Sequence, residues 1–181
     1  RRYVGDHILT QNDVRKEGRF EDIVAYGGWP MDDHHPAGLR YPGEPTIFHP
    51  APSPFGIPYR SLYSRNIENL FCAGRNVSVT HAAMSATRVM ATCATLGQAV
   101  GTAAAIAVKN GLSPRGVYER KLSLLKETLM DDDCWLPFNT RPIPELTKTA
   151  RVRASDGDAA SLVNGVDRPV GGADNGLWLP A

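Results

Sequence analysis

The stretch that most constrains the fold runs from Asn69 to Asn110 and begins NLFCAGRNVSVTHAAMSATRVMATC. Residues 68–74 predict a buried strand that ends at Gly74, and residues 82–110 predict one long helix. That helix contains mostly small side chains, which let a neighbouring backbone or a flat ligand approach closely. Lys109 in its last turn and the Asn-Gly pair that follows predict a well-formed helix end. A junction of strand, glycine and helix favours an α/β fold with a ligand at the end of the strand.

Weaker patterns predict the remaining elements. Strands are expected over residues 1–10, 22–28 and 57–64, and a short helical turn over residues 11–17 follows the capping pair Thr10 and Asp13. Residues 29–58 hold most of the prolines and predict one long, functional loop. Ser113 and Pro114 predict the cap and first residue of a second helix, which ends near Asp131.

The composition excludes some classes of partner. The 20 Lys and Arg residues balance the 19 Asp and Glu residues, and the basic residues form no run. We therefore expect no nucleic-acid partner. Cys72, Cys93 and Cys134 form no CxxC pair, which predicts buried reduced thiols, and this stretch carries no iron–sulfur motif. Both ends look cut from a longer protein, so the sequence leaves the cellular location open.

The small-residue helix must also be weighed as a membrane span. Residues 89–108 carry no charge, have about the required length, and include the pattern Gly97-x-x-x-Gly101. However, the segment is mostly Ala, Thr and Gly and has few of the large aliphatic side chains that drive insertion. We therefore expect no span, and instead a helix that is buried on every side against sheets and a flat ligand.

After residue 140 the composition changes. Residues 147–155 alternate like an edge strand, and the remaining residues are punctuated by Gly, Asp and Asn. The pattern predicts a linker and then the first strands of an all-β module. Too few residues remain to close a sandwich.

Several motifs together carry a resemblance to a known family. They are GDHILTQND, AYGGWPMDDHHP, the long run IPYRSLYSRNIENLFCAGRNVSVTHAAMSATRVMATCATLGQAVGTAAAIA, and DDDCWLP. Over residues 1–137 the chain resembles the C-terminal part of FAD-dependent oxidoreductases of the glutathione-reductase-like superfamily. It is most similar to the bacterial group described as heterodisulfide reductase A-like. The tail resembles the start of a galactose-binding-like β-sandwich.

This resemblance implies an organisation in three parts. Residues 1–68 would be part of a substrate or cap domain, residues 69–140 the last strand and helices of the FAD-binding domain, and residues 141–181 a linker with a truncated β module. The implied fold is α/β, with α+β character in this chain. The chain has no Gly-x-Gly-x-x-Gly fingerprint, which the family carries upstream, so we expect one wall of a flavin site and no FAD binding by these 181 residues alone.

The resemblance also implies a set of cofactor-binding residues. Gly74 and Arg75 fall where the family approaches the ribityl-pyrophosphate of FAD. Thr92 and Cys93 fall where the first amides of a helix face the pyrimidine edge of the flavin, although the residues after Arg88 are bulkier than the usual glycines. The later Gly-x-Ala-x-Gly position corresponds to Gly97 and Gln98.

Hydride transfer to a flavin needs a substrate held against the ring and often a proton-accepting group. The catalytic candidates are Arg88, His35, Arg60 and His81. Arg60 fits a structural ion pair equally well, and each histidine fits a hydrogen-bonded loop residue. A metal site at residues 32–35 is not expected, because successive residues on a strand point apart. The predicted substrate is a small molecule, with sugar-derived compounds as one candidate class. The alternative function is a carbohydrate-binding or structural module without redox activity.

Overall fold

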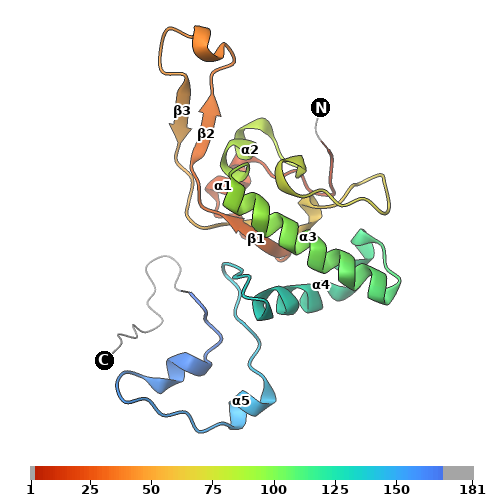
Figure 1. The fold of residues 1–181 in the computed structure, drawn as a ribbon, viewed down its shortest axis with the longest axis vertical. Coiled ribbons are helices and arrows are strands. Elements are labelled where there is room, and N and C mark those ends of the chain that lie inside the picture. The colour runs from red at the N-terminus through yellow and green to blue at the C-terminus, as the bar shows by residue number, and fades with distance from the viewer. Residues whose placement is uncertain (1–2, 169–181) are drawn as a thin grey trace.

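The computed structural model describes residues 3–168, which form a mixed α+β arrangement (Figure 1). The helices are α1 (Gln11–Arg15), α2 (His81–Thr87), α3 (Met90–Asn110), α4 (Pro114–Asp131) and α5 (Glu145–Thr149). The strands are β1 (Ile23–Gly27), β2 (Met31–His34), β3 (Thr46–His49) and β4 (Phe55–Pro58). Short 3-10 helices cover Gly38–Arg40, Tyr59–Ser61, Gly74–Asn76 and Ala159–Val163.

The centre of the molecule is the antiparallel pair of β1 and β4, which packs against α3 and α4. Ala25 lies opposite Ile57, and the register shifts between Ile23 and Ala25. All four residues of β4 are buried. The core is completed by the inner faces of both long helices; its largest fully buried side chains include Tyr59, Tyr63, Phe55, Leu9, Ile57, Leu62, Leu96, Leu125 and Leu129.

The predicted helix ends are confirmed at three places. The Thr10 hydroxyl accepts from the Asp13 amide, and the Asp13 carboxylate accepts from the Thr10 amide, so α1 begins with a complete capping box. Ser113 caps α4 by accepting from the Gly116 amide, with Pro114 as the first residue. Helix α3 ends at Gly111 in the left-handed conformation, with φ of 60°.

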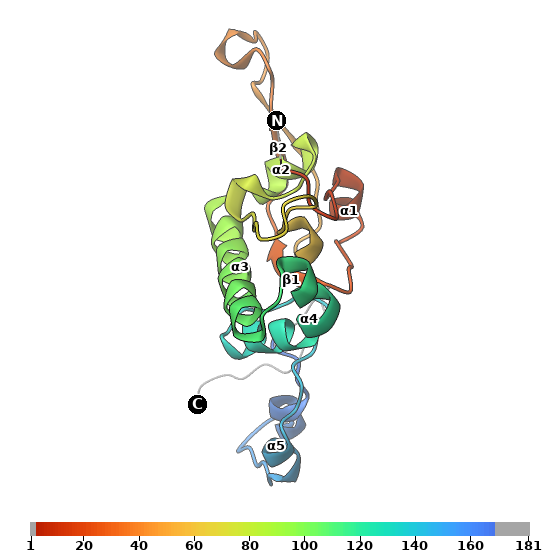
Figure 2. The ribbon, with the colours of Figure 1, turned by 90° about the vertical axis from the view of Figure 1, so that its right-hand side faces the viewer.

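The prolines predict one long loop over residues 29–58, and this prediction is wrong. β2 and β3 pair in register from Met31 opposite His49 to His34 opposite Thr46, and β4 follows. Figures 1 and 2 show this hairpin extending away from the body, with its base beside α2. Except for Pro58, the last residue of β4, the prolines of this stretch lie outside the strands, where a missing N–H costs no ladder hydrogen bond.

Three predicted strands are wrong or much shorter. Residues 3–10 form only isolated bridges at Gly5 and Leu9, and residues 59–61 turn into a 3-10 helix directly after β4. In the predicted buried strand over 68–74, only Phe71 is bridged, to Tyr63. Residues 62–64 and 70–72 do face each other, because the Ser64 amide donates to the Leu70 carbonyl at 2.9 Å and the Cys72 amide donates to the Leu62 carbonyl at 2.7 Å. The pairing covers only about three residues on each side, which is too short for a regular strand.

The long helix predicted over 82–110 is two helices, because α2 ends before Arg88 and α3 begins after Val89. Val89 is extended, with φ of −69° and ψ of 148°, and no Gly or Pro marks the break. Thr87 is buried, and its carbonyl accepts from the Cys93 thiol at 3.7 Å. Thr87 and Val89 are β-branched, and such residues adopt extended backbone more readily than most. Tertiary contacts such as that of Cys93 with Thr87 then hold the break in place.

Helix α3 is buried on one face and not all round. Its buried residues are Thr92, Leu96, Ala99, Ala103, Ile106 and Ala107. Its exposed residues include Met90, Ala94, Gly97, Gln98, Gly101, Ala105 and Val108. Figure 2 shows this helix along one side of the body. By length and composition alone α3 would be apolar enough to cross a membrane, a test that core helices also pass.

The prediction of β structure after residue 140 is wrong for the described part of the tail. Residues 141–168 contain α5 and the 3-10 helix Ala159–Val163, and no strand. The predicted edge strand over 147–155 instead begins with the last turn of α5, where Lys148 and Glu145 pair along the helix. The rest of the predicted module, residues 169–181, lies outside the described residues.

Candidate functional site

The break between α2 and α3 creates a new helix start in the middle of the small-residue segment. Val89 is the residue before α3, and no side chain caps it. The amides of Met90, Ala91 and Thr92 therefore have no carbonyl one turn earlier within the helix. The dipole of this 21-residue helix places partial positive charge at the same point. The start of α3 can accordingly bind a carbonyl or anionic oxygen.

The segment with Gly74 packs against the first turn of α3. Gly74 has φ of 66°, and a Cβ added to it would lie 4.0 Å from the Cβ of Cys93. Burial raises the pKa of the Cys93 thiol, and the nearby charge of Arg75 opposes that increase. The structure thus brings together Gly74, Arg75, Thr92 and Cys93, four of the predicted cofactor-binding residues.

Gly97 and Gln98, the other two, lie further along α3 on its exposed face. A Cβ added to Gly97 would meet nothing within 4 Å in the described chain. This part of the helix surface is therefore open to a ligand or to another protein segment. Whether either residue binds the cofactor stays a prediction.

Arg88 lies at the break itself and reaches the β2–β3 hairpin. One guanidinium nitrogen, Nη2, is 3.5 Å from the Asp32 carboxylate and donates to the Asp32 carbonyl at 3.2 Å. His81 lies at the start of α2, and its Nε2 is 3.0 Å from the carboxylate of Asp33. A cavity of about 100 Å³ lies among these groups. The structure thus brings Arg88 and His81 together, with two carboxylates that the sequence suggested only as metal ligands.

A second cavity of about 220 Å³ lies where β1 ends and α3 begins. Its walls are mostly apolar and include Tyr26, Gly27, Gly28, Trp29, Val89, Ala91, Thr92 and Thr95. Trp29 is 46% exposed although it is a large apolar side chain. Sequence reasoning missed Tyr26 and Trp29, although the pair of glycines followed by an aromatic residue after a strand was a signal for such a pocket.

The other two catalytic candidates lie in different surroundings. His35 stacks on Tyr41 in the loop of the hairpin, with ring centroids 3.7 Å apart. The Arg60 guanidinium forms two hydrogen bonds with the fully buried Asp22, at 2.9 and 3.0 Å. Asp22 thereby raises the pKa of Arg60 further above its ordinary value. This contact matches the ion-pair alternative for Arg60, and catalytic roles for both residues stay predictions.

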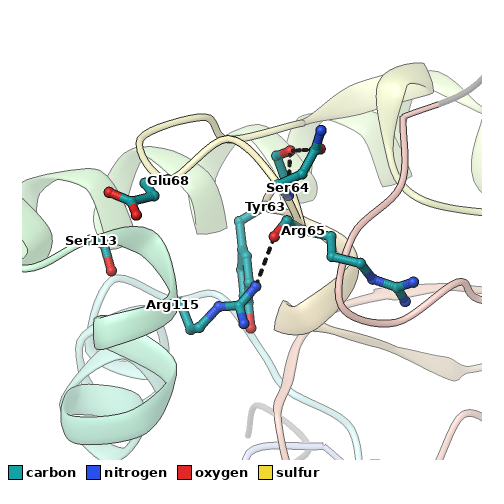
Figure 3. Close-up of a pocket in the computed structure, with 7 residues that line it drawn as sticks. Tyr63, Ser64, Arg65, Glu68, Ser113 and Arg115 are labelled. Carbon is teal, nitrogen blue, oxygen red and sulfur yellow. Dashed lines mark hydrogen bonds between the residues drawn. The ribbon is translucent and has the colours of Figure 1, made fainter.

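A polar cavity of about 450 Å³ lies at the start of α4, as Figure 3 shows. Its lining residues are Tyr63, Ser64, Arg65, Asn66, Glu68, Ser113 and Arg115. Arg115 donates to the Arg65 carbonyl at 3.1 Å and pairs with Asp6 at 2.7 Å. Its charge is therefore already neutralised within the chain. Sequence reasoning did not identify this cavity.

The described residues contain no group of three or more His, Cys, Asp or Glu side chains that could hold a metal ion. The three cysteines are free thiols; Cys72 is buried, and Cys93 and Cys134 are partly buried. Burial is the main cause of a raised thiol pKa at all three. These thiols are therefore mostly protonated at neutral pH.

Comparison with known proteins identifies the family. A model of the family described as FAD dependent oxidoreductase matches residues 1–129, which include both strand pairs, the helix break and nearly all of α4. FAD is the cofactor of this family. No curated protein and no solved structure gave a significant match. Because the family model covers well over half of the sequence, this chain belongs to the family of FAD-dependent oxidoreductases.

Proposed function

We propose that the start of α3 and the 3-10 turn Gly74–Asn76 form one wall of the FAD site of an enzyme that transfers hydride between a small molecule and FAD. The observation that carries this proposal is the uncapped start of α3, placed between an apolar cavity and the guanidinium of Arg88. The family match supplies the cofactor.

The residues present fit a flavin nucleotide in their chemistry. The amides at the start of α3 are donors for the carbonyl edge of a flavin ring, and the helix dipole favours the negative charge of the reduced ring. Arg75, in the 3-10 turn Gly74–Asn76, is an exposed cation that suits the phosphate groups of FAD. Gly74, Thr92, Cys93, Gly97 and Gln98 would complete the wall, as the resemblance implies.

When bound, FAD accepts or donates the hydride. The side chains of this chain would orient the substrate and exchange protons with it. Arg88 can orient a polar or anionic group of the substrate, because its side chain lies next to the start of α3 and is 33% exposed. His81 is the candidate group for proton exchange with the substrate, and the Asp33 carboxylate, 3.0 Å from its Nε2, orients the ring. The apolar cavity beside Trp29 offers an apolar surface on one side of the site.

Several finer assignments remain parts of this proposal. Similarity to the heterodisulfide reductase A-like group, the boundaries at residues 68 and 140, and a sugar-derived substrate rest on the resemblance. We also propose that nucleic acid is no partner and that α3 packs within protein instead of crossing a membrane. The burial of Leu96 and Ala103 against the core supports the latter. The carbohydrate-binding alternative rests on the tail alone, whose described residues form no strand.

Replacement of Met90 tests whether the first turn of α3 faces the flavin. Met90 is 90% exposed and follows an extended residue, so proline fits as the first residue of the helix. Met90→Pro removes one amide donor and retains the helix. We expect bound FAD in this variant to have a lower midpoint potential than in Met90→Ala, with similar melting temperatures, as measured by spectroelectrochemistry in the holoenzyme. Equal potentials in the two variants would count against this placement of the flavin.

A further inference from the structure

We propose that Asp32 is a positioning residue, which fixes the guanidinium of Arg88 relative to the start of α3 and so ties the β2–β3 hairpin to the flavin site. This inference rests on the proposed function, because it assigns Asp32 a task only if Arg88 acts beside the flavin. Nothing in the sequence pattern pairs the two residues, which are 56 positions apart.

The contacts of Arg88 converge on this one residue. Its Nη2 atom contacts both the side chain of Asp32, at 3.5 Å, and the main-chain carbonyl, at 3.2 Å. Arg88 is the residue where α2 ends, and its own amide donates to the Met84 carbonyl. The backbone of Arg88 is thus fixed by α2, and the orientation of its long side chain is fixed from the hairpin.

Burial makes this contact stronger than an ordinary surface ion pair. The side chains of Arg88 and Asp32 are 33% and 18% exposed. The second oxygen of Asp32, Oδ1, is buried without a hydrogen-bond partner and lies 3.6 Å from Nε2 of His34. A carboxylate held in this way depends on the guanidinium as its main compensating charge. The pair should therefore act as a unit.

The neighbouring residue provides a matched control. Asp33 is on the same strand and carries the same charge, but its carboxylate pairs with His81 instead of Arg88. Asp32→Asn and Asp33→Asn remove the same charge one residue apart and keep the shape of the side chain. Any effect of charge alone on the flavin should be similar in both variants.

The two explanations of Asp32 predict opposite signs. If the carboxylate merely lowers the positive charge near the flavin, Asp32→Asn should raise the midpoint potential of FAD, because reduced FAD gains negative charge. If the carboxylate positions Arg88, its loss frees the guanidinium, and the potential should fall toward that of Arg88→Gln. Asp33→Asn should then leave the potential unchanged or raise it.

The experiment measures the midpoint potential of bound FAD in the holoenzyme for Asp32→Asn, Asp33→Asn, Arg88→Gln and the double variant Asp32→Asn Arg88→Gln. We expect Asp32→Asn to give most of the downward shift of Arg88→Gln, and the double variant to add no further decrease. Circular dichroism checks the fold. Asp32→Glu keeps the charge and should lower the midpoint potential by less than Asp32→Asn does. If Asp32→Asn does not fold, the milder Asp32→Glu alone must still lower the potential.

The outcomes separate this inference from the proposed function. If Arg88→Gln leaves the potential unchanged, Arg88 does not act beside the flavin, and the role proposed for it fails. If Arg88→Gln lowers the potential but Asp32→Asn raises it, or shifts it by the same amount in both backgrounds, Arg88 keeps its role and Asp32 is not its positioning residue.

Discussion

Arg60→Ala should lower the free energy of unfolding by about 3 kcal/mol, because it leaves a buried carboxylate without its partner. Asp22 is fully buried and accepts from the Arg60 amide as well as from the guanidinium. Without the guanidinium, Asp22 would keep only the hydrogen bond from the Arg60 amide and the electrostatic interaction with Lys126. Thermal unfolding followed by circular dichroism should show a melting temperature lower by roughly 6–12 °C in a chain of this size.

The double variant Asp22→Asn Arg60→Met separates this ion pair from simple packing. If the cost of Arg60→Ala comes from an uncompensated charge, removing both charges should recover most of the lost stability. Arg19→Ala is the surface control, because Arg19 is 60% exposed in its pair with Glu17 and should contribute about 1 kcal/mol or less. A double variant as unstable as Arg60→Ala would contradict this explanation.

Arg88→Ala should slow the reduction of bound FAD by its substrate by about 10²-fold, the effect typical of removing one positioned group that stabilises developing charge. The physical reason is that Arg88 is a cation only two residues before Met90, the first residue of α3 with a free amide. Anaerobic stopped-flow measurement of the decay of FAD absorbance gives the limiting rate. The effect should appear in that rate and not only in the apparent affinity for the substrate.

Arg115→Ala is the matched control for this variant. Arg115 is also a partly exposed arginine paired with an aspartate, Asp6, but it lies at the start of α4. Its replacement should leave the rate of flavin reduction within about twofold of the rate of the unmodified protein, because Arg115 lies away from the flavin site. Equal slowing in both variants would indicate a general loss of structure and would remove the special role of Arg88.

Local signals predicted three helix ends well and the sheet poorly. The capping box at Thr10, the Ser113-Pro114 start and the Gly111 end are decided by residues within one turn, so they can be read from the sequence. Strands depend on partners distant in the chain, as β1 does on β4. Alternation could therefore indicate extended backbone at residues 3–10 and 68–74, but not whether a neighbouring strand exists there.

The candidate site divides in the same way. The resemblance grouped Gly74, Arg75, Thr92 and Cys93, and the structure places their segments in contact. The break after Arg88 was missed, because no Gly or Pro marks it and buried contacts of Thr87 accompany it. The partnership of Arg88 with Asp32 was missed because it depends on how the hairpin folds against α2. Sequence reasoning thus named candidate residues but not the pairs that they form.

The visible absorption spectrum of the protein purified from its complete gene tests the central claim most directly. We expect the purified protein to show the absorption of oxidised FAD, at about one FAD per chain, and this absorption to bleach on anaerobic reduction. We also expect the FAD to be retained through gel filtration, because the start of α3 and Arg75 contribute to a built site. A folded, colourless protein that does not take up added FAD would contradict the assignment of a flavin site.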